Sequence, residues 1–379
     1  MKVVIASDKF KGSLTSQEVA NCIEEGILAA MPDCSITKLL VADGGDGTAE
    51  AMIYSLNGYW ITKEVKNPLG KPIMARYGIV NNDTAVLDVA TASGIALLNK
   101  ADANPLETSS IGTGELILDA INNGYKKIMI GVGGSATNDA ATGILYALGY
   151  RFLDDSGNVL YPCGKNLSRI CTIDKSSVTP EIKDCEFTLL CDVDASYYGK
   201  NGAAYLFAPQ KGADEKMVKM LDDGLQTFAN LISKTTGKNV QHQSYSGAAG
   251  GIGGSLWALL GAKLTPGIYT LLNTINFEKA IQHADLVITG EGSMDKVSLL
   301  GKTPYGVCGE AAWNGVPTIA FVGEVSDYDR LNEYGFLSVY PIQPGPIEMQ
   351  EAMNPSIASE NLKRTVTQVF RTLLINAKK

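Results

Sequence analysis

The pattern of apolar and polar positions changes twice along the chain. In residues 1–66, short apolar runs alternate with apolar residues at helical spacing, which predicts a strand, a helix, a second strand and a second helix. The same βα alternation returns after residue 284. The expected strands cover residues 3–6, 36–42, 285–289, 316–321 and 337–340. The expected helices cover 48–56, 304–314 and 360–375, and the first helix has the apolar face Val19, Ile23, Ile27 and Ala30. Thr15 and Glu18 form a capping box that starts the first helix.

The middle of the chain departs from this alternation. Residues 73–80 and 84–90 are strand-like, and the turn formers between them predict an antiparallel hairpin. A chain of 379 residues is long enough for two domains. We therefore predict an α/β fold with two domains. One is a discontinuous flavodoxin- or Rossmann-like parallel-sheet domain, residues 1–66 plus 284–379, and the other is an inserted α/β domain with mixed strands, residues 67–283.

Residues 127–143 carry the sharpest local pattern, because an apolar run stops at glycines and restarts with helical spacing. The glycines are Gly131, Gly133 and Gly134, and the cap-type residues that follow them are Ser135, Thr137 and Asn138. Such a strand–turn–helix junction points free backbone N–H groups and the positive end of a helix dipole at one spot. It suits a phosphate or a carboxylate.

Three interpretations fit this junction. The glycines alone can make a tight turn between a strand and a helix. They can also form a dinucleotide fingerprint, since Gly131, Gly133 and Ala136 match G-x-G-x-x-A and Asp154 follows where a ribose-binding acid is expected. This second interpretation predicts an NAD(P)-dependent oxidoreductase. The third interpretation is an anion cradle, either in a phosphoryl-transfer enzyme or in a protein that binds a small sugar acid.

Composition narrows the range of partners. The net charge of −8 disfavours nucleic acid, whereas local lysines still allow a small anionic substrate. The seven cysteines are scattered and never spaced as C-x-x-C, which predicts free thiols in the cytoplasm and no zinc site. The N-terminus enters a strand directly, so we expect neither a signal peptide nor a membrane span. A homo-oligomer is compatible with these features.

Four polar loops at predicted strand ends combine carboxylates with glycine or lysine. They contain Asp8 with Lys9 and Lys11, Asp43 with Asp46, Asp192 with Asp194, and Glu291 with Asp295 and Lys302. Carboxylates can hold Mg²⁺, lysines neutralise phosphate oxygens, and glycine loops let backbone N–H groups reach them. These are the parts of phosphoryl transfer. The sequence contains neither a Walker A motif nor a protein-kinase signature set, so the predicted kinase belongs to another class.

These loops resemble those of the bacterial glycerate kinase family, of the glycerate 2-kinase type. The resemblance runs through residues 7–14, 41–48, 113–116, 131–139, 191–193, 209–213, 247–251, 289–292 and 301–302, and so covers nearly the whole chain in order. It implies ATP- and Mg²⁺-dependent phosphorylation of D-glycerate. It also implies two α/β domains, the first made from both chain ends, with the active site in the cleft between them.

The resemblance further implies the site residues. The expected catalytic residues are Asp8, Lys11, Asp43, Asp46, Asp192, Glu291, Asp295 and Lys302. The expected substrate- or nucleotide-binding residues are Lys9, Gly44, Gly45, Gly133, Gly134, Ser135, Thr137, Asn138, Gly250, Gly251, Gly290 and Gly292. The expected Mg²⁺ ligands are Asp192, Glu291 and Asp295.

Two positions depart from the family pattern. The family usually has Arg where Ser293 stands, and a Gln-Thr or Gln-Ser pair where Val297 and Ser298 stand. Contacts made there in other members are therefore missing or rebuilt in this chain, which bears on the role of Asp295. The family commonly phosphorylates O2, so the resemblance favours 2-phosphoglycerate over 3-phosphoglycerate as the product.

Overall fold

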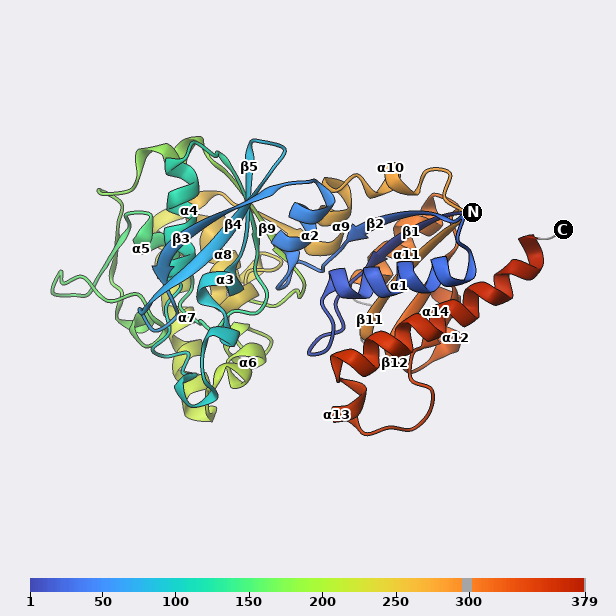
Figure 1. The fold of residues 1–379 in the computed structure, drawn as a ribbon. Helices are drawn as coiled ribbons and strands as arrows, with labels where there is room; N and C mark the ends of the chain where they lie inside the picture. Colours follow the sequence, from blue (N-terminus) through green and yellow to red (C-terminus); the bar gives the residue numbers. More distant parts are fainter. Residues whose placement is uncertain (295–301, 378–379) are drawn as a thin grey trace. The chain divides into compact units, whose positions relative to one another are not determined.

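The computed structural model describes residues 1–294 and 302–377, and the chain divides into two compact units (Figure 1). The first unit comprises Met1–Asp43, Glu50–Leu56 and Ile268–Lys379, and the second comprises Gly44–Ala49 and Asn57–Gly267. These bounds differ from the predicted ranges in three places, the first being Gly44–Ala49, which belongs to the second unit. Residues 57–66 also belong to the second unit and residues 268–283 to the first. That the units are independently folding domains stays a prediction.

The first unit is built on a five-stranded parallel sheet in the order β13-β12-β11-β1-β2. Its strands are β1 (Lys2–Ser7), β2 (Ser35–Leu40), β11 (Leu286–Met294), β12 (Thr318–Val325) and β13 (Phe336–Pro341). Counted within this unit, the order is 2-1-3-4-5, which is the flavodoxin-like arrangement and confirms the predicted parallel sheet. Sheets of this kind bind ligands at the carboxyl ends of the strands where the order reverses, here β1 and β11.

Helices cover both faces of this sheet. Two of them, α1 (Ser16–Ala30) and α14 (Pro355–Ala377), lie side by side (Figure 1), and a Cβ at Gly26 would lie 2.8 Å from Cβ of Val366. Right-handed crossovers place α1 and α11 (Thr303–Trp313) on opposite faces, because the chain moves in opposite directions across the sheet from β1 and from β11. The Thr15–Glu18 capping box is confirmed.

Several short helices of the first unit were not predicted from the sequence. These are α9 (Gly267–Thr274), α10 (Phe277–Ile281), α12 (Tyr328–Tyr334) and α13 (Met349–Ala352), whereas α2 (Thr48–Ser55) was predicted. The aromatic ring of Tyr305 in α11 packs against Phe336 with 5.6 Å between ring centroids, so α11 is anchored to β13. None of the helices in the described ranges combines the length and apolar character needed to cross a bilayer.

The second unit is built on a six-stranded mixed sheet in the order β10-β9-β6-β5-β4-β3. Its strands are β3 (Tyr59–Lys66), β4 (Pro72–Val80), β5 (Thr84–Asp88), β6 (Lys127–Gly131), β9 (Glu186–Cys191) and β10 (Lys263–Pro266). β4 pairs antiparallel with β5, as predicted, and also with β3. From β5 to β10 the strands are parallel, so their carboxyl ends lie at one edge.

Helices and short connections surround this mixed sheet. The helices are α3 (Val89–Ser93), α4 (Ile111–Asn122), α5 (Thr142–Ala147), α6 (Ala203–Phe207), α7 (Glu215–Thr236) and α8 (Ala248–Leu260). Short 3₁₀ helices cover Ile95–Leu97, Lys100–Asp102, Gly164–Arg169, Pro180–Asp184, Pro209–Lys211 and Val240–His242, and β7 (Arg151–Leu153) pairs with β8 (Thr172–Asp174). The apolar stripe of α7 belongs to the core, since Leu221, Leu225 and Phe228 are fully buried.

Candidate functional site

The first cluster of predicted site residues lies at the carboxyl ends of β1 and β2, in the first unit. β1 ends at Ser7, so Asp8 is the first residue beyond it, and Asp43 follows β2. The amide of Asp8 donates to the carbonyl of Gly290 in β11 at 3.0 Å. This bond ties the β1 loop to the neighbouring strand where the strand order reverses. The cluster therefore occupies the position at which open parallel sheets place ligands.

The side chain of Asp8 is buried and fixed by its neighbours. Oδ1 accepts from the amide of Lys9 at 2.7 Å and the hydroxyl of Ser16 at 3.4 Å, and Oδ2 accepts from the hydroxyl of Thr303 at 2.9 Å. Burial, and after it the like charge of Asp43, raise the pKa of Asp8 to about 6, although the bonds from Lys9 and Thr303 oppose the rise. A carboxyl group with this pKa can take a proton from a substrate hydroxyl near neutral pH.

The predicted lysines of this cluster lie in the loop that follows β1. Lys9 is half-buried, and Lys11 is exposed in the tight turn after Asp8. A Cβ at Gly292 would lie 3.4 Å from the amide nitrogen of Lys11, so β11 passes close to this turn. The two ammonium groups and the backbone amides beside them are suited to negatively charged oxygens.

Two further predicted residues of the first unit lie near these loops. Glu291 is half-buried in β11, and Lys302 is half-buried immediately before α11. Outside the described residues lie Asp295, Val297 and Ser298. Among residues 1–294 and 302–377, no group of three or more His, Cys, Asp or Glu side chains is arranged to hold a metal ion. The Mg²⁺ ligands Asp192, Glu291 and Asp295 therefore stay a prediction.

The second cluster lies in the second unit, where Gly44–Ala49 meets the carboxyl ends of β5 and β6. The carbonyl of Gly44 accepts from the amides of Val132 at 3.0 Å and Gly133 at 3.4 Å. A Cβ at Gly133 would lie 2.4 Å from Cα of Gly45, so no other residue fits this position without displacing the backbone. The two predicted glycine loops thus form one structure in which backbone packs directly on backbone.

Asp88, which is not among the predicted site residues, anchors this loop. It is the buried last residue of β5, and its carboxylate accepts from the amides of Gly47 at 3.0 Å and Ala49 at 3.1 Å. Asp46 is exposed on the same loop, and a Cβ at Gly134 would lie 3.4 Å from Cβ of Asp46. The sequence does contain a signal for this role: Asp88 lies at the end of an apolar strand, and a buried carboxylate must find N–H donors.

The loop after β6 corrects the predicted strand–turn–helix junction. The helix α5 begins at Thr142, and no side chain caps its first turn from the N-cap position. Two left-handed residues precede it, Ala140 with φ of 53° and Ala141 with φ of 59°. They interrupt the helical pattern that the apolar spacing indicated, so Ser135, Thr137 and Asn138 are loop residues. The prediction that these three side chains cap a helix was wrong.

A different acid, Asp139, organises the start of α5. Its Oδ2 accepts from the amide and the hydroxyl of Ser110, each at 2.8 Å, and from the amide of Gly143 at 3.2 Å. Asp139 is fully buried, and this burial raises the pKa of its carboxyl. Its hydrogen bonds within the second unit fix the end of the glycine loop.

The second glycine-rich loop packs against the first. Ala249, Gly250 and Gly251 have φ of 52°, 74° and 90°, so the regular part of α8 begins after them. A Cβ at Gly250 would lie 2.4 Å from the carbonyl oxygen of Thr137, and the amide of Ala140 donates to the carbonyl of Gly250 at 3.0 Å. The structure therefore brings together predicted binding residues that are more than a hundred positions apart in the sequence.

The predicted acids after β9 lie at the same edge of the mixed sheet. Asp192 is half-buried and directly follows the strand. Asp194 is exposed, and its Oδ1 accepts from the amide of Tyr245 at 2.6 Å. Asp194 therefore fixes the loop that leads into α8.

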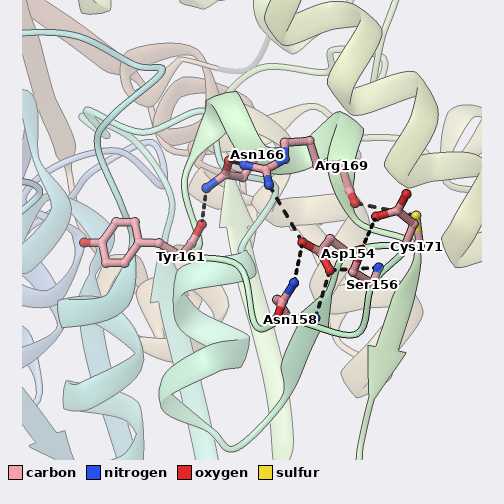
Figure 2. A network of polar contacts seen from close by, with 8 residues as sticks. Asp154, Ser156, Asn158, Tyr161, Asn166, Arg169 and Cys171 are labelled. Atoms are coloured by element: carbon pink, nitrogen blue, oxygen red, sulfur yellow. Dashed lines mark hydrogen bonds and ion pairs between the residues drawn. The ribbon is translucent and has the colours of Figure 1, made fainter.

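The dinucleotide interpretation fails at Asp154 (Figure 2). The carboxylate of Asp154 accepts from the amides of Ser156 at 3.1 Å and Asn158 at 2.8 Å, and it lies 3.8 Å from the guanidinium of Arg169. β7, which precedes it, pairs antiparallel with β8 in a separate two-stranded sheet. In a dinucleotide fold this strand would lie parallel in the main sheet. Asp154 is therefore a turn residue.

Comparison with known proteins agrees with the kinase interpretation. The sequence profile of the Glycerate kinase family matches residues 3–374. A Glycerate kinase from Bacillus subtilis is 40% identical over 375 residues, which is 98% of this chain and 98% of that protein. Glycerate 2-kinase from Escherichia coli K12 is 40% identical over 377 residues, covering 99% of this chain and 98% of that one.

Similarity extends to a solved structure. A crystal structure from Salmonella typhimurium LT2, described under the name glycerate kinase 2, aligns with a TM-score of 0.88 and 38% identity over 100% of both chains. The profile, the relatives and the solved structure each span nearly the whole chain. The chain therefore belongs to the glycerate kinase family, and it is a phosphotransferase.

Proposed function

We propose that the protein transfers the terminal phosphoryl group of ATP to the O2 hydroxyl of D-glycerate and releases 2-phosphoglycerate and ADP. The family supports the kinase reaction, and the name Glycerate 2-kinase of the Escherichia coli relative supports the O2 position. The observation that carries the proposal is the carboxylate pair of Asp8 and Asp43 at the strand-order reversal, with the pKa of Asp8 raised to about 6.

In the proposed reaction Asp8 is the base. The O2 oxygen of glycerate attacks the γ-phosphorus of ATP while its proton passes to the Asp8 carboxylate. The new P–O bond forms as the bond from the γ-phosphorus to the β–γ bridging oxygen breaks, and that oxygen leaves with the electron pair on ADP. A pKa of about 6 leaves Asp8 largely ionised at pH 7 yet basic enough to share the proton in the transition state. Lys9 and Lys11 stabilise the negative charge on the transferred group.

The acids present in each unit fit Mg²⁺. Carboxylate oxygens are its preferred protein ligands; the first unit offers Glu291 within β11 and the second offers Asp192 directly after β9, both half-buried. Mg²⁺ usually binds through one or two carboxylates plus the phosphates of the substrate. An ion that arrives with ATP therefore does not need a cluster of three acids, and residues 1–294 and 302–377 contain no such cluster. When bound, the ion offsets the charge of the phosphate oxygens.

We also propose a role for the glycine loops and a location for the protein. The amides of Val132 and Gly133 are engaged by Gly44, and those of Gly47 and Ala49 by Asp88, so the proposed role of these loops is to hold the backbone beside the site in one conformation. All seven cysteines are free, as is usual in a reducing compartment, which supports a cytoplasmic location.

A coupled ADP assay with Mg-ATP and D-glycerate tests this function, and ³¹P NMR of the product reads the position of the phosphate. We expect turnover with D-glycerate and a product identical to authentic 2-phosphoglycerate. L-glycerate and lactate serve as controls, because lactate lacks the O3 hydroxyl and still offers an O2 hydroxyl. A spectrum matching 3-phosphoglycerate would overturn the regiochemistry, and turnover with another acid but not with D-glycerate would overturn the substrate.

A further inference from the structure

Lys211 is a buried lysine that the proposed reaction does not use. It ends the 3₁₀ helix Pro209–Lys211 and is 3% exposed. Its Nζ donates to the hydroxyl of Ser135 at 2.8 Å and to the carbonyl of Thr137 at 2.7 Å. The ammonium group therefore holds the middle of the loop after β6 at two points.

The charge of Lys211 lacks a direct counterion in the part of the chain that the structure describes. Both hydrogen-bond acceptors are neutral, and the charged group that acts on Lys211 is Asp139. The Oδ2 of Asp139 is engaged by Ser110 and by the start of α5. Burial lowers the pKa of Lys211 to about 7, although the charge of Asp139 opposes this shift. A buried cation in this state gains stability from any anion brought close to it.

A second observation at the same loop indicates a ligand. The side chain of Asn138 is fully buried, yet neither Oδ1 nor Nδ2 has a hydrogen-bond partner within residues 1–294 and 302–377. The hydroxyl of Thr137 is buried and unpartnered in the same described ranges. Unpartnered buried polar groups are costly and therefore rare, and each of them calls for an explanation such as a bound ion or another ligand.

The backbone around this loop is held in an unfavourable conformation. Ala140, Ala141 and Ala249 all have φ between 52° and 59°, a left-handed region that alanine rarely adopts. The bond from the amide of Ala140 to the carbonyl of Gly250 locks two of these segments together. Strain of this kind persists where the surrounding structure enforces it, and it clusters at binding sites.

We propose that the loop Ser135–Thr137–Asn138, held by Lys211, recognises an anionic group of a substrate, and that Lys211 is its positioning residue. The identity of the anion rests on the proposed function, which supplies two sources: the phosphates of ATP and the carboxylate of D-glycerate. Lys211 acts by fixing the loop and by placing a positive charge behind it. Binding of the anion favours the protonated ammonium, so the protein takes up a proton with its ligand at pH values above 7.

Calorimetric titration of the full chain with ATP alone, D-glycerate alone and pyrophosphate alone, from pH 7.5 to 8.5, tests this role. For Lys211→Met we expect the affinity of the recognised anion to fall by about tenfold or more, with the other ligand unaffected. Wild-type affinity for that anion should fall as pH rises, and Lys211→Met should lose this pH dependence. Lys211→Arg, whose charge persists at every pH used, should restore part of the affinity and remain independent of pH.

Lys219→Met is the matched control, because Lys219 is exposed on the neighbouring helix α7. This variant should bind all three ligands like the wild type. If Lys211→Met loses affinity for both ATP and pyrophosphate, the recognised anion is a phosphate. If it loses affinity for D-glycerate, the recognised anion is the carboxylate. Affinities of Lys211→Met within about twofold of wild type for all three probes overturn the proposal. If Lys211→Met does not fold, pH-independent wild-type affinity for every probe overturns it instead. The coupled ADP assay on the same protein reports separately whether the proposed function holds.

Discussion

The ionised carboxylate of Asp8 lowers the stability of the folded protein, because it is buried and lies near Asp43. Its folded pKa, about 6, is above the unfolded value of 3.8, so the native state binds more protons than the unfolded state between these two values. The contribution of Asp8 to stability is therefore fully present below about pH 4 and is lost as pH rises through about 6. A buried carboxyl beside Asp43 is hence kept at the expense of stability at neutral pH.

Substitution of Asp8 by Asn separates the catalytic role from the structural one. The amide keeps the size of the side chain, its oxygen accepts from the amide of Lys9 and its nitrogen donates to the hydroxyl of Thr303, but it cannot take a proton. We expect kcat/KM to fall by on the order of a hundredfold or more at pH 7. Urea unfolding at pH 5 and pH 7 should show that Asp8→Asn lacks the decrease in stability that the wild type shows over this range. A variant that is less stable than the wild type at pH 7, with activity reduced in proportion, would mean that Asp8 is structural.

At the level of elements, the loop Gly44–Ala49 depends on one carboxylate from β5. Asp88 accepts from two amides of this loop, at 3.0 and 3.1 Å. Asp88→Asn replaces one acceptor oxygen by a donor facing an N–H group, so we expect a loss of about 1–3 kcal/mol in the free energy of unfolding. Urea denaturation measures this loss. Asp214→Asn is the control, because the N-cap of α7 accepts from the amide of Met217 equally well with either residue. Equal stability of the two variants would contradict the anchoring role.

The contact between the two glycine loops gives a second prediction for an element. In Gly133→Ala the new Cβ would lie 2.4 Å from Cα of Gly45, so one loop must move. We expect a loss of about 1–3 kcal/mol in stability together with most of the activity. Gly309→Ala in α11 is the control, since its nearest neighbour, the hydroxyl of Tyr334, lies 3.7 Å away. That control should be neutral or up to about 1 kcal/mol more stable in thermal unfolding. A Gly133→Ala protein with wild-type activity would show that the loops adjust freely.

At the scale of the whole molecule, the strand β3 decides where the main segment of the second unit begins. β3 pairs with β4 from Tyr59↔Ile79 to Lys66↔Pro72, so a fragment of residues 67–283 loses an entire edge strand. We expect a fragment of residues 57–267 to unfold cooperatively in urea, as followed by circular dichroism. The fragment 67–283 should unfold at lower urea or without a cooperative transition. Equal midpoints for the two fragments would contradict this assignment of β3.

Much of the fold was predictable because local patterns set it. The parallel strands of the first unit appear as short apolar runs, and the capping box of α1 depends only on Thr15 and Glu18. The hairpin of β4 and β5 follows from the turn formers between them. The interruption before α5 was missed, since nothing in the sequence marks Ala140 and Ala141 as left-handed. Their φ values depend on the packing of the second glycine loop, which is remote in the chain.

The sequence by itself determined the strands, most long helices and the polar loops that carry Asp8, Asp43 and the glycines, since spacing and turn chemistry act over a few residues. Only the tertiary structure decided which of these residues act together. It placed Asp43 close enough to raise the pKa of Asp8, brought Asp88 to the Gly44–Ala49 loop and buried Lys211 behind Ser135. Each of these interactions joins positions more than thirty residues apart, and burial and through-space charge have no signature in local sequence.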